Sequence, residues 1–187
     1  MDHNALHWLR QRRTVRRFTA DDVKDDEIET LLEMAMYAPN RLNRQPWHFV
    51  VIRDAKIKKG LSDLLRVHPY LEAAPVVIAV ASTYDTSPTW LMDISAATEN
   101  LLLAATALGL GSAWIGSPDT VMWDIAEEWM HDTLGIPFSV RIPTLVAVGH
   151  PAEQPEPHSR EDRWDRSKVH YDCWGNHNES GGRGGGV

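Results

Sequence analysis

The chain of 187 residues suits one domain that buries roughly two-thirds or more of its unfolded surface, and its hydrophobic share of 43% is ordinary for a globular protein. Its formal net charge of -7 argues against non-specific nucleic-acid binding, which needs a broad basic face. The single cysteine, Cys173, excludes an intrachain disulfide and a Cys-rich zinc site, so we expect a reducing compartment.

Two stretches bear on targeting. The N-terminal residues 1–13 lack an apolar core followed by a small-residue cleavage site, so they do not resemble a signal peptide. Residues 100–118 carry no charge, but "GLG" at 109–111 and several polar residues interrupt the span. A buried helix followed by a buried strand explains this span better than a membrane helix. We therefore expect a soluble, cytoplasmic protein.

The first half of the chain predicts three helices and two strands. A short helix is expected over 4–12, and a second begins after "TADD", is capped by Asp25 or Asp26, and ends at Pro39. The β-rich run 47–53 predicts a strand, and 55–66 has apolar residues at helical spacing. The run 74–82 is apolar without alternation, as in a strand covered on both faces.

The second half predicts two more helices, two strands and a long tail. The helix over 88–108 is apolar nearly all round, so we expect it to be partly buried in a subunit interface. A short strand over 111–116 precedes a helix with Ser117 as N-cap and Pro118 at its first position. The last strand covers 141–151. The arm that follows has no clear period and should pack as an extended segment, whereas the Gly-rich end is expected to be flexible.

Four strands alternating with helices predict an α+β fold, a three-layer α/β/α sandwich with a central mixed sheet of about four to five strands flanked by helices. We assign a single domain over 1–174, including the arm 152–174, and a flexible tail over 175–187. A plain dinucleotide-binding fold is excluded because no strand is followed by a G-x-G-x-x-G turn. The nearest match, "GLGSAWIG", precedes a strand instead of opening a helix.

The stretch "RRTVRRF" at 12–18 crowds four arginines into six residues of an acidic chain. Guanidinium forks and the Thr14 hydroxyl suit a phosphate, and Arg12, Thr14 and Arg16 can share one side of an extended segment. The alternative is a solvated basic surface paired with nearby aspartates. The residues alone leave both possibilities open.

Three other stretches are rich in polar residues. The loop between Pro39 and Pro46 holds two Asn, two Arg and one Gln, whose amides match the edge of a heterocycle, although local hydrogen bonds of a turn explain them too. Gly116 joins a strand end to a helix N-terminus, where free N–H groups bind an anion or serve ordinary capping. Arg160 and Arg163 lie in the arm. The chain has no H-E-x-x-H, P-loop or G-x-S-x-G motif.

Taken in order, these stretches resemble the FMN-dependent nitroreductase family over roughly residues 8–174. The resemblance is carried by "RRTVRRF", "APNRLNRQPWHFVVIRD", "DISAATENLLLAATALGLGSAWIG", "IPTLVAVGHPAEQPEP" and an arm ending in "VHYDCWG". It implies an α+β sandwich that forms an intimate homodimer, with FMN bound at the subunit interface.

The resemblance also implies a set of cofactor-binding residues and no catalytic or metal-binding side chain. The N-terminal segment holds the FMN phosphate and ribityl chain, the 39–45 loop contributes at least partly from the other subunit, and the strand end lies along the isoalloxazine. Arg17 is expected to pair with nearby aspartates instead. The implied contacts are Arg12, Arg13, Thr14, Arg16, Pro39, Asn40, Arg41, Asn43, Gln45, Trp114, Ile115, Gly116 and, closing on the phosphate from the arm, Arg160.

Three positions depart from the family pattern. Asn40 and Arg41 stand where small residues such as Ser are often found, and a large cation at Arg41 could approach the flavin or narrow the pocket. Cys173 stands where Arg is common. The sequence assigns no role to either change.

The resulting hypothesis is an FMN oxidoreductase in which NADH or NADPH passes hydride to flavin N5. An electron-poor acceptor then takes the same place, such as a nitroaromatic, a quinone or an activated alkene. The cofactor carries this chemistry, which explains the lack of an evident acid–base pair. The alternatives are a specialised flavoenzyme of the same superfamily (a dehalogenase, a ring dehydrogenase or a flavin-converting enzyme), a flavin-binding protein without turnover, and a non-flavin interaction module.

Overall fold

The computed structural model describes residues 5–177. The chain divides into two compact units, Met1–Glu156 and Pro157–Val187. The assignment of the arm 152–174 to the same domain as the rest stays a prediction. The expected flexible tail over 175–187 lies outside the described residues from 178 onward.

The first unit is built on one sheet of four strands, as the sequence predicted. The strands pair in the order β1-β2-β4-β3, and every pairing between them is antiparallel. The expectation of a mixed sheet is therefore wrong, because each strand pairs with antiparallel neighbours. The parallel pairing among the described residues is an isolated bridge between Thr14 and Ser112. The strands are β1 (Trp47–Ile52), β2 (Val76–Ser82), β3 (Gly111–Ile115) and β4 (Arg141–Gly149).

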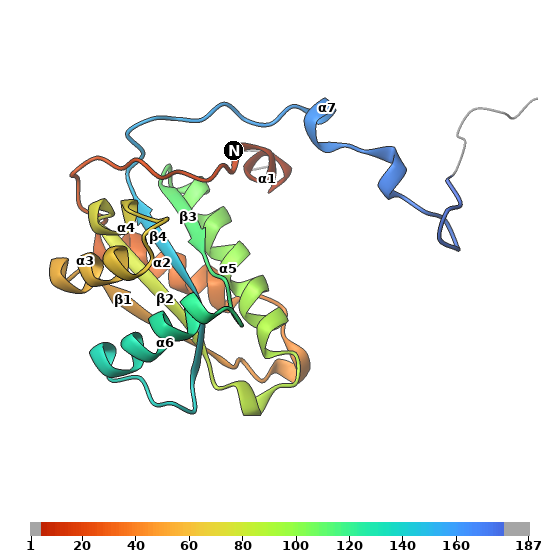
Figure 1. The fold of residues 1–187 in the computed structure, drawn as a ribbon. Coiled ribbons are helices and arrows are strands. Elements are labelled where there is room, and N and C mark those ends of the chain that lie inside the picture. The colour runs from red at the N-terminus through yellow and green to blue at the C-terminus, as the bar shows by residue number, and fades with distance from the viewer. Residues whose placement is uncertain (1–4, 178–187) are drawn as a thin grey trace, which may run out of the picture. The chain divides into compact units, whose positions relative to one another are not determined.

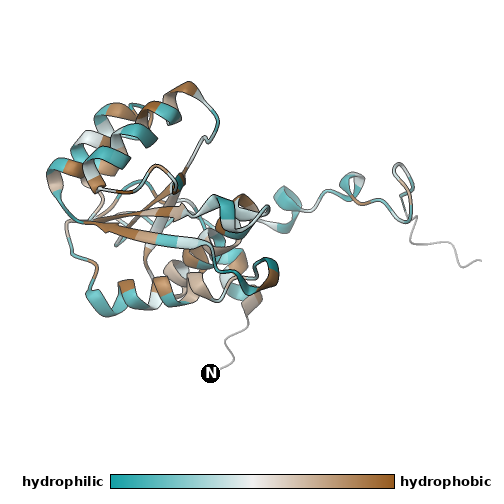
Figure 2. Ribbon diagram, turned by 90° about the horizontal axis from the view of Figure 1, so that it is seen from below, coloured by the Kyte–Doolittle hydropathy of each residue, from teal (hydrophilic) through white to brown (hydrophobic). Residues whose placement is uncertain are grey.

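Helices cover both faces of this sheet (Figure 1). One hydrophobic cluster joins α2 and α5 to β2 and β4, and a second joins α3, α4 and α6 to the opposite face. The three-layer α+β sandwich is therefore confirmed, and Figure 2 shows the hydrophobic strands between the two helical layers. The helices of the first unit are α1 (Ala5–Gln11), α2 (Asp25–Met36), α3 (Ala55–Leu64), α4 (Tyr70–Ala73), α5 (Trp90–Ala107) and α6 (Val121–Leu134).

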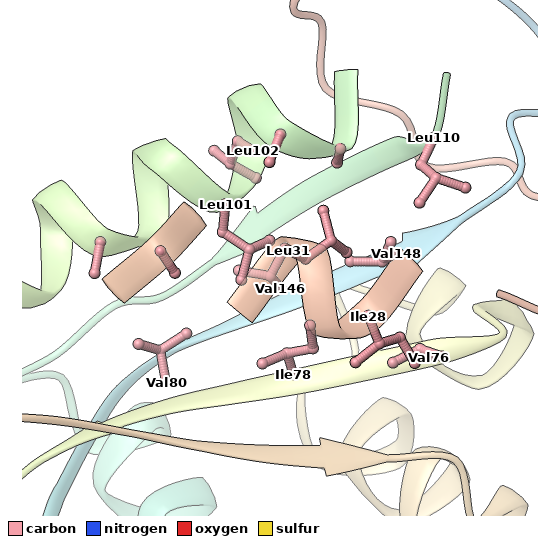
Figure 3. Packing of buried hydrophobic residues seen from close by; sticks show 14 of the residues in the cluster. Ile28, Leu31, Val76, Ile78, Val80, Leu101, Leu102, Leu110, Val146 and Val148 are labelled. Atoms are coloured by element: carbon pink, nitrogen blue, oxygen red, sulfur yellow. The ribbon is translucent and has the colours of Figure 1, made fainter. Parts of the chain in front are cut away.

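The central strands explain why both layers exist. Every residue of β2 is buried, and β4 is buried from its second residue to its last. Leu31 of α2 and Leu101 of α5 are fully buried and pack over Val146 of β4 (Figure 3). Because successive strand side chains point to opposite faces, an unbroken apolar run requires a helical layer on each side.

Two predicted helix starts are wrong. Helix α2 has Lys24 at its cap position, and the Lys24 N–H donates to the Glu27 carboxylate at 2.8 Å. Helix α6 begins at Val121 and is capped by Thr120, not Ser117. The reason is the backbone of Asp119, whose φ of 64° is left-handed and interrupts any helix that starts at Pro118.

Candidate functional site

The arginine-rich segment follows α1 and runs across one end of the sheet (Figure 1). It is held to the start of β3, because the Val15 N–H donates to the Ser112 carbonyl at 2.9 Å. Val15 is buried against Gly111, where a Cβ atom would lie only 2.7 Å from a Val15 methyl group. The absence of a side chain at Gly111 therefore sets how closely the segment approaches the sheet.

The arginines of this segment point to different surroundings. The Arg12 guanidinium lies 3.5 Å from the Glu99 carboxylate on α5, in one helical layer. The Arg16 guanidinium lies 5.9 Å from the centroid of the Tyr70 ring, which belongs to α4 in the other layer. The structure thus does not bring these two side chains together, and Thr14 lies between them at the sheet edge.

Arg13 and Arg17 differ in their partners. Arg17 donates to the Glu153 carboxylate at 3.1 Å, so the expected pairing of Arg17 with the nearby aspartates is wrong. Arg13 lines a pocket of about 250 Å³ together with Trp8, Gln11 and Gln154. Within residues 5–177, no hydrogen bond or ion pair engages the Arg13 guanidinium. This cation is therefore available to an anion.

Arg16 also affects the pKa values of two neighbours, His68 and Tyr70. The Tyr70 hydroxyl and His68 Nδ1 are 3.0 Å apart. Burial, followed by the positive charge of Arg16, lowers the pKa of His68 below its ordinary value of 6.5. Burial raises the pKa of Tyr70, and Arg16 acts in the opposite direction. Both side chains consequently favour their neutral forms beside a cation at neutral pH.

Local hydrogen bonds stabilise the loop that follows Pro39, as expected if its amide side chains serve a turn. Asn40 Oδ1 accepts from the Gln45 N–H at 2.9 Å, and the Gln45 side-chain amide donates to Asn43 Oδ1 at 3.2 Å. Leu42, Asn43 and Gln45 have φ values of 51°, 54° and 48°. Three left-handed non-glycine residues in so short a loop store backbone strain, which is typical of functional loops.

Hydrogen bonds across the fold fix this loop from outside. The Arg41 N–H donates to Asp93 Oδ1 at 3.3 Å, and the Arg44 guanidinium donates to the Thr86 carbonyl. Sequence reasoning missed Asp93 and the turn before it. A signal was present, since Asp93 is the only charged residue between Trp90 and Thr98, the first half of the helix.

The strand end at 114–116 forms an edge of the sheet, because β3 pairs only with β4. The Ser112 carbonyl points to the edge, so the backbone polar groups of Trp114, two residues on, point there too. Ile115 is buried, and its carbonyl accepts from the Thr144 hydroxyl at 2.6 Å. At Gly116 a Cβ atom would lie 2.8 Å from the Pro143 carbonyl oxygen, so this close approach requires glycine.

The predicted contact in the arm belongs to the second unit and is described by itself. Arg160 opens the short helix α7 (Arg160–Arg163), which Ser159 caps by accepting from the Asp162 N–H at 3.1 Å. The Arg160 guanidinium lies 5.3 Å from the centroid of the Trp164 ring. A stacked guanidinium keeps its donors free at the ring edges. Closure of Arg160 on a phosphate stays a prediction.

Residues 9–69 and 67–150 match the model of the Nitroreductase family. The chain therefore belongs to the nitroreductase family, as its sequence motifs predicted. Within the described residues, no helix is both long enough and apolar enough to cross a membrane.

Individual relatives agree with this placement. A protein of Archaeoglobus fulgidus, named as a candidate NADH dehydrogenase/NAD(P)H nitroreductase, is 33% identical over 174 residues, covering 91% of this chain and 98% of the relative. An FMN-dependent nitroreductase from Clostridium difficile R20291 superposes with a TM-score of 0.84 at 25% identity, covering 90% and 99% of the two chains. A candidate nitroreductase from Desulfovibrio desulfuricans, solved in complex with FMN, gives 0.74 at 30% identity, covering 86% and 93%.

The lowered pKa of His68 predicts a pH dependence of stability. As the pH falls, the unfolded chain takes up this proton first, so the free energy of unfolding should decrease between about pH 7 and pH 5. His68→Gln should make that decrease shallower, as should Arg16→Ala, which removes the charge beside the ring. Urea unfolding at several pH values measures both slopes. Identical slopes in wild type and His68→Gln would contradict the assignment.

Proposed function

We propose that this chain is an FMN-dependent oxidoreductase that takes electrons from NADH or NADPH and passes them to an electron-poor acceptor, such as a nitroaromatic or a quinone. The observation that carries the proposal is the arginine-rich segment held to the start of β3 at one end of the sheet of a nitroreductase fold, with Arg13 lacking any partner in the described residues. Relatives named for NAD(P)H and FMN support the same chemistry.

The residues present suit the cofactor. Guanidinium groups and a threonine hydroxyl are the donors that a phosphate needs, and the exposed edge of β3 offers backbone groups to a flat heterocycle. The Arg12–Glu99 pair joins partly exposed groups at 3.5 Å and is worth about 1 kcal/mol or less, so it would not prevent Arg12 from turning to a phosphate. When bound, FMN would supply the hydride-transfer chemistry, and the chain would bind and orient it.

We assign the binding roles by segment. Arg12, Arg13, Thr14 and Arg16 hold the phosphate and ribityl chain, and Arg160 closes on the phosphate from the arm. The strand end provides backbone contacts along the ring, and the loop provides amides and the cation of Arg41. The ring and loop contacts are Trp114, Ile115, Gly116, Pro39, Asn40, Arg41, Asn43 and Gln45.

The reaction itself tests the proposal. The purified protein should bind added FMN, and anaerobic NADH or NADPH should bleach the flavin absorbance, which an added quinone or nitroaromatic then restores. Stopped-flow absorbance of the FMN-loaded protein measures both half-reactions. Failure to bind FMN would overturn the whole proposal. Binding without bleaching by either nucleotide would instead favour a flavin-binding protein without turnover.

Substitutions within the arginine segment test the phosphate assignment. Because a charge-assisted hydrogen bond is worth about 1.5–3 kcal/mol, Arg12→Ala and Arg16→Ala should each raise the FMN dissociation constant about 10-fold to 100-fold. Arg17→Ala is the matched control, since Arg17 lies in the same segment and pairs with Glu153. Fluorescence titration measures the constants. Equal losses of FMN affinity in all three variants would contradict the assignment of a specific phosphate site to Arg12 and Arg16.

We further propose that the working form is a homodimer with FMN at the subunit interface and the loop acting on the partner's cofactor. Helix α1 has no buried residue, and its Leu6 and Leu9 are 54% and 51% exposed. Leu42 and Met92 are more exposed still, at 74% and 71%. Leu6 and Leu9 lie three residues apart on one face of α1, and apolar side chains that gather on an exposed face are typical of an interface.

Sedimentation velocity of the FMN-loaded protein should therefore give a species of twice the chain mass of 21.1 kDa at micromolar concentration. Leu9→Glu should shift the protein toward monomer, because it places a charge in the proposed apolar contact. The same substitution should weaken FMN binding, since the site would be incomplete. A stable, FMN-loaded monomer would contradict the interface proposal.

A further inference from the structure

Asp93 is a buried carboxylate in the first turn of α5 that joins two loops. Its exposed fraction is 5%. The Ser87 hydroxyl donates to Oδ2 at 2.8 Å, and the Thr89 hydroxyl lies 3.3 Å from both carboxylate oxygens. From the other loop, the Arg41 N–H donates to Oδ1 at 3.3 Å. One side chain therefore connects the turn before α5 to the loop that follows Pro39.

The burial of Asp93 depends on these donors. A buried carboxylate is costly unless it is paired or hydrogen-bonded. In the part of the chain that the structure describes, no ion pair engages Asp93, so the hydroxyl groups, the Arg41 N–H and the positive end of the α5 dipole share the task. Because a separation of the loop from α5 would leave the carboxylate poorly satisfied, Asp93 resists that separation.

A second set of contacts ties the same two segments together. The Arg44 guanidinium donates to the Thr86 carbonyl, and the Thr83 N–H donates to the Pro46 carbonyl at 3.0 Å. The loop is thus attached to the 83–93 segment near its start by Asp93, in its middle by Thr86 and at its end by Thr83. Its left-handed residues need such support, since strained backbone persists only where the surroundings fix it.

We propose that Asp93 is a positioning residue for the cofactor loop. It would not touch FMN, but would hold Asn40 and Arg41 in the conformation that meets the flavin and thereby reduce the entropy that the loop loses on binding. This inference rests on the FMN function proposed above. Arg44, through its bond to Thr86, is the second support of the same loop.

The experiment compares FMN binding with stability in matched variants. Asp93→Ala removes both carboxylate oxygens, which accept from the Arg41 N–H and the Ser87 hydroxyl, and should raise the FMN dissociation constant about 10-fold. Asp93→Asn keeps one carbonyl oxygen for the Arg41 N–H and should recover most of that affinity. The control is Thr98→Val, which removes a buried hydroxyl bond to the Ile94 carbonyl on the same helix. It should lower the unfolding midpoint without changing the FMN dissociation constant more than about 2-fold.

Arg44→Ala keeps the inference testable should Asp93→Ala fail to fold, since Arg44 is exposed. It should weaken FMN binding about 5-fold, and the double variant should lose less than the product of the single losses, because both side chains hold one loop. Unchanged FMN affinity in both single variants, or an equal loss in Thr98→Val, would overturn the positioning role alone. A wild-type protein that does not bind FMN would overturn the proposed function, and the inference with it.

Discussion

The architecture depends on the antiparallel pairing of β2 with β4, two strands that are buried on both faces. Because neither strand offers a polar face to water, α2 and α5 must cover one side and α3, α4 and α6 the other. The backbone groups open to a ligand then lie at the ends of the sheet and along its two edge strands, β1 and β3. The arginine segment attaches at the edge strand β3, where the Val15 N–H donates to the Ser112 carbonyl. The position of the candidate site therefore follows from the burial of the central strands.

Four arginines crowded into six residues are tolerated because the segment crosses the end of the sheet and separates them. Arg12 faces Glu99 of α5, Arg16 lies over the Tyr70 ring of α4, and Arg17 pairs with Glu153. Their mutual repulsion falls with distance, and Arg12 and Arg17 each meet an opposing charge. Arg13 is the exception, since no ion pair, hydrogen bond or ring contact engages its guanidinium within the described residues. An anionic ligand is the natural complement of this remaining charge.

Sequence patterns predicted the elements well where burial alone decides them. The runs 47–53, 74–82 and 141–151 contain β1, β2 and β4. A short apolar run of this kind can be recognised as a strand from its own residues, without information on the segments that pack against it. The start of α6 was missed, since it depends on the left-handed backbone of Asp119, a non-glycine residue that carries no reliable signal for this conformation. The Arg17–Glu153 pair joins residues 136 positions apart, and no local pattern contains that information. The family motifs supplied the candidate site, but not which helix each arginine contacts.

Two buried acids of the first unit, Asp93 and Glu127, each hold a segment that is distant in sequence. Asp93 binds the Arg41 N–H, and Glu127 of α6 accepts from the Ile142 N–H at 2.6 Å and from Arg141 Nε at 2.9 Å. In each case a helix carboxylate fixes a backbone N–H of a segment distant in sequence. Glu127 has a guanidinium partner and acts on the start of β4, where Arg141 also pairs with Ser82 of β2. That strand pairing would still hold the segment if the carboxylate were lost. Asp93 has no such partner and acts on a strained loop with no strand to hold it. Of these two carboxylates, Asp93 is therefore the one whose loss would free a segment of the candidate site.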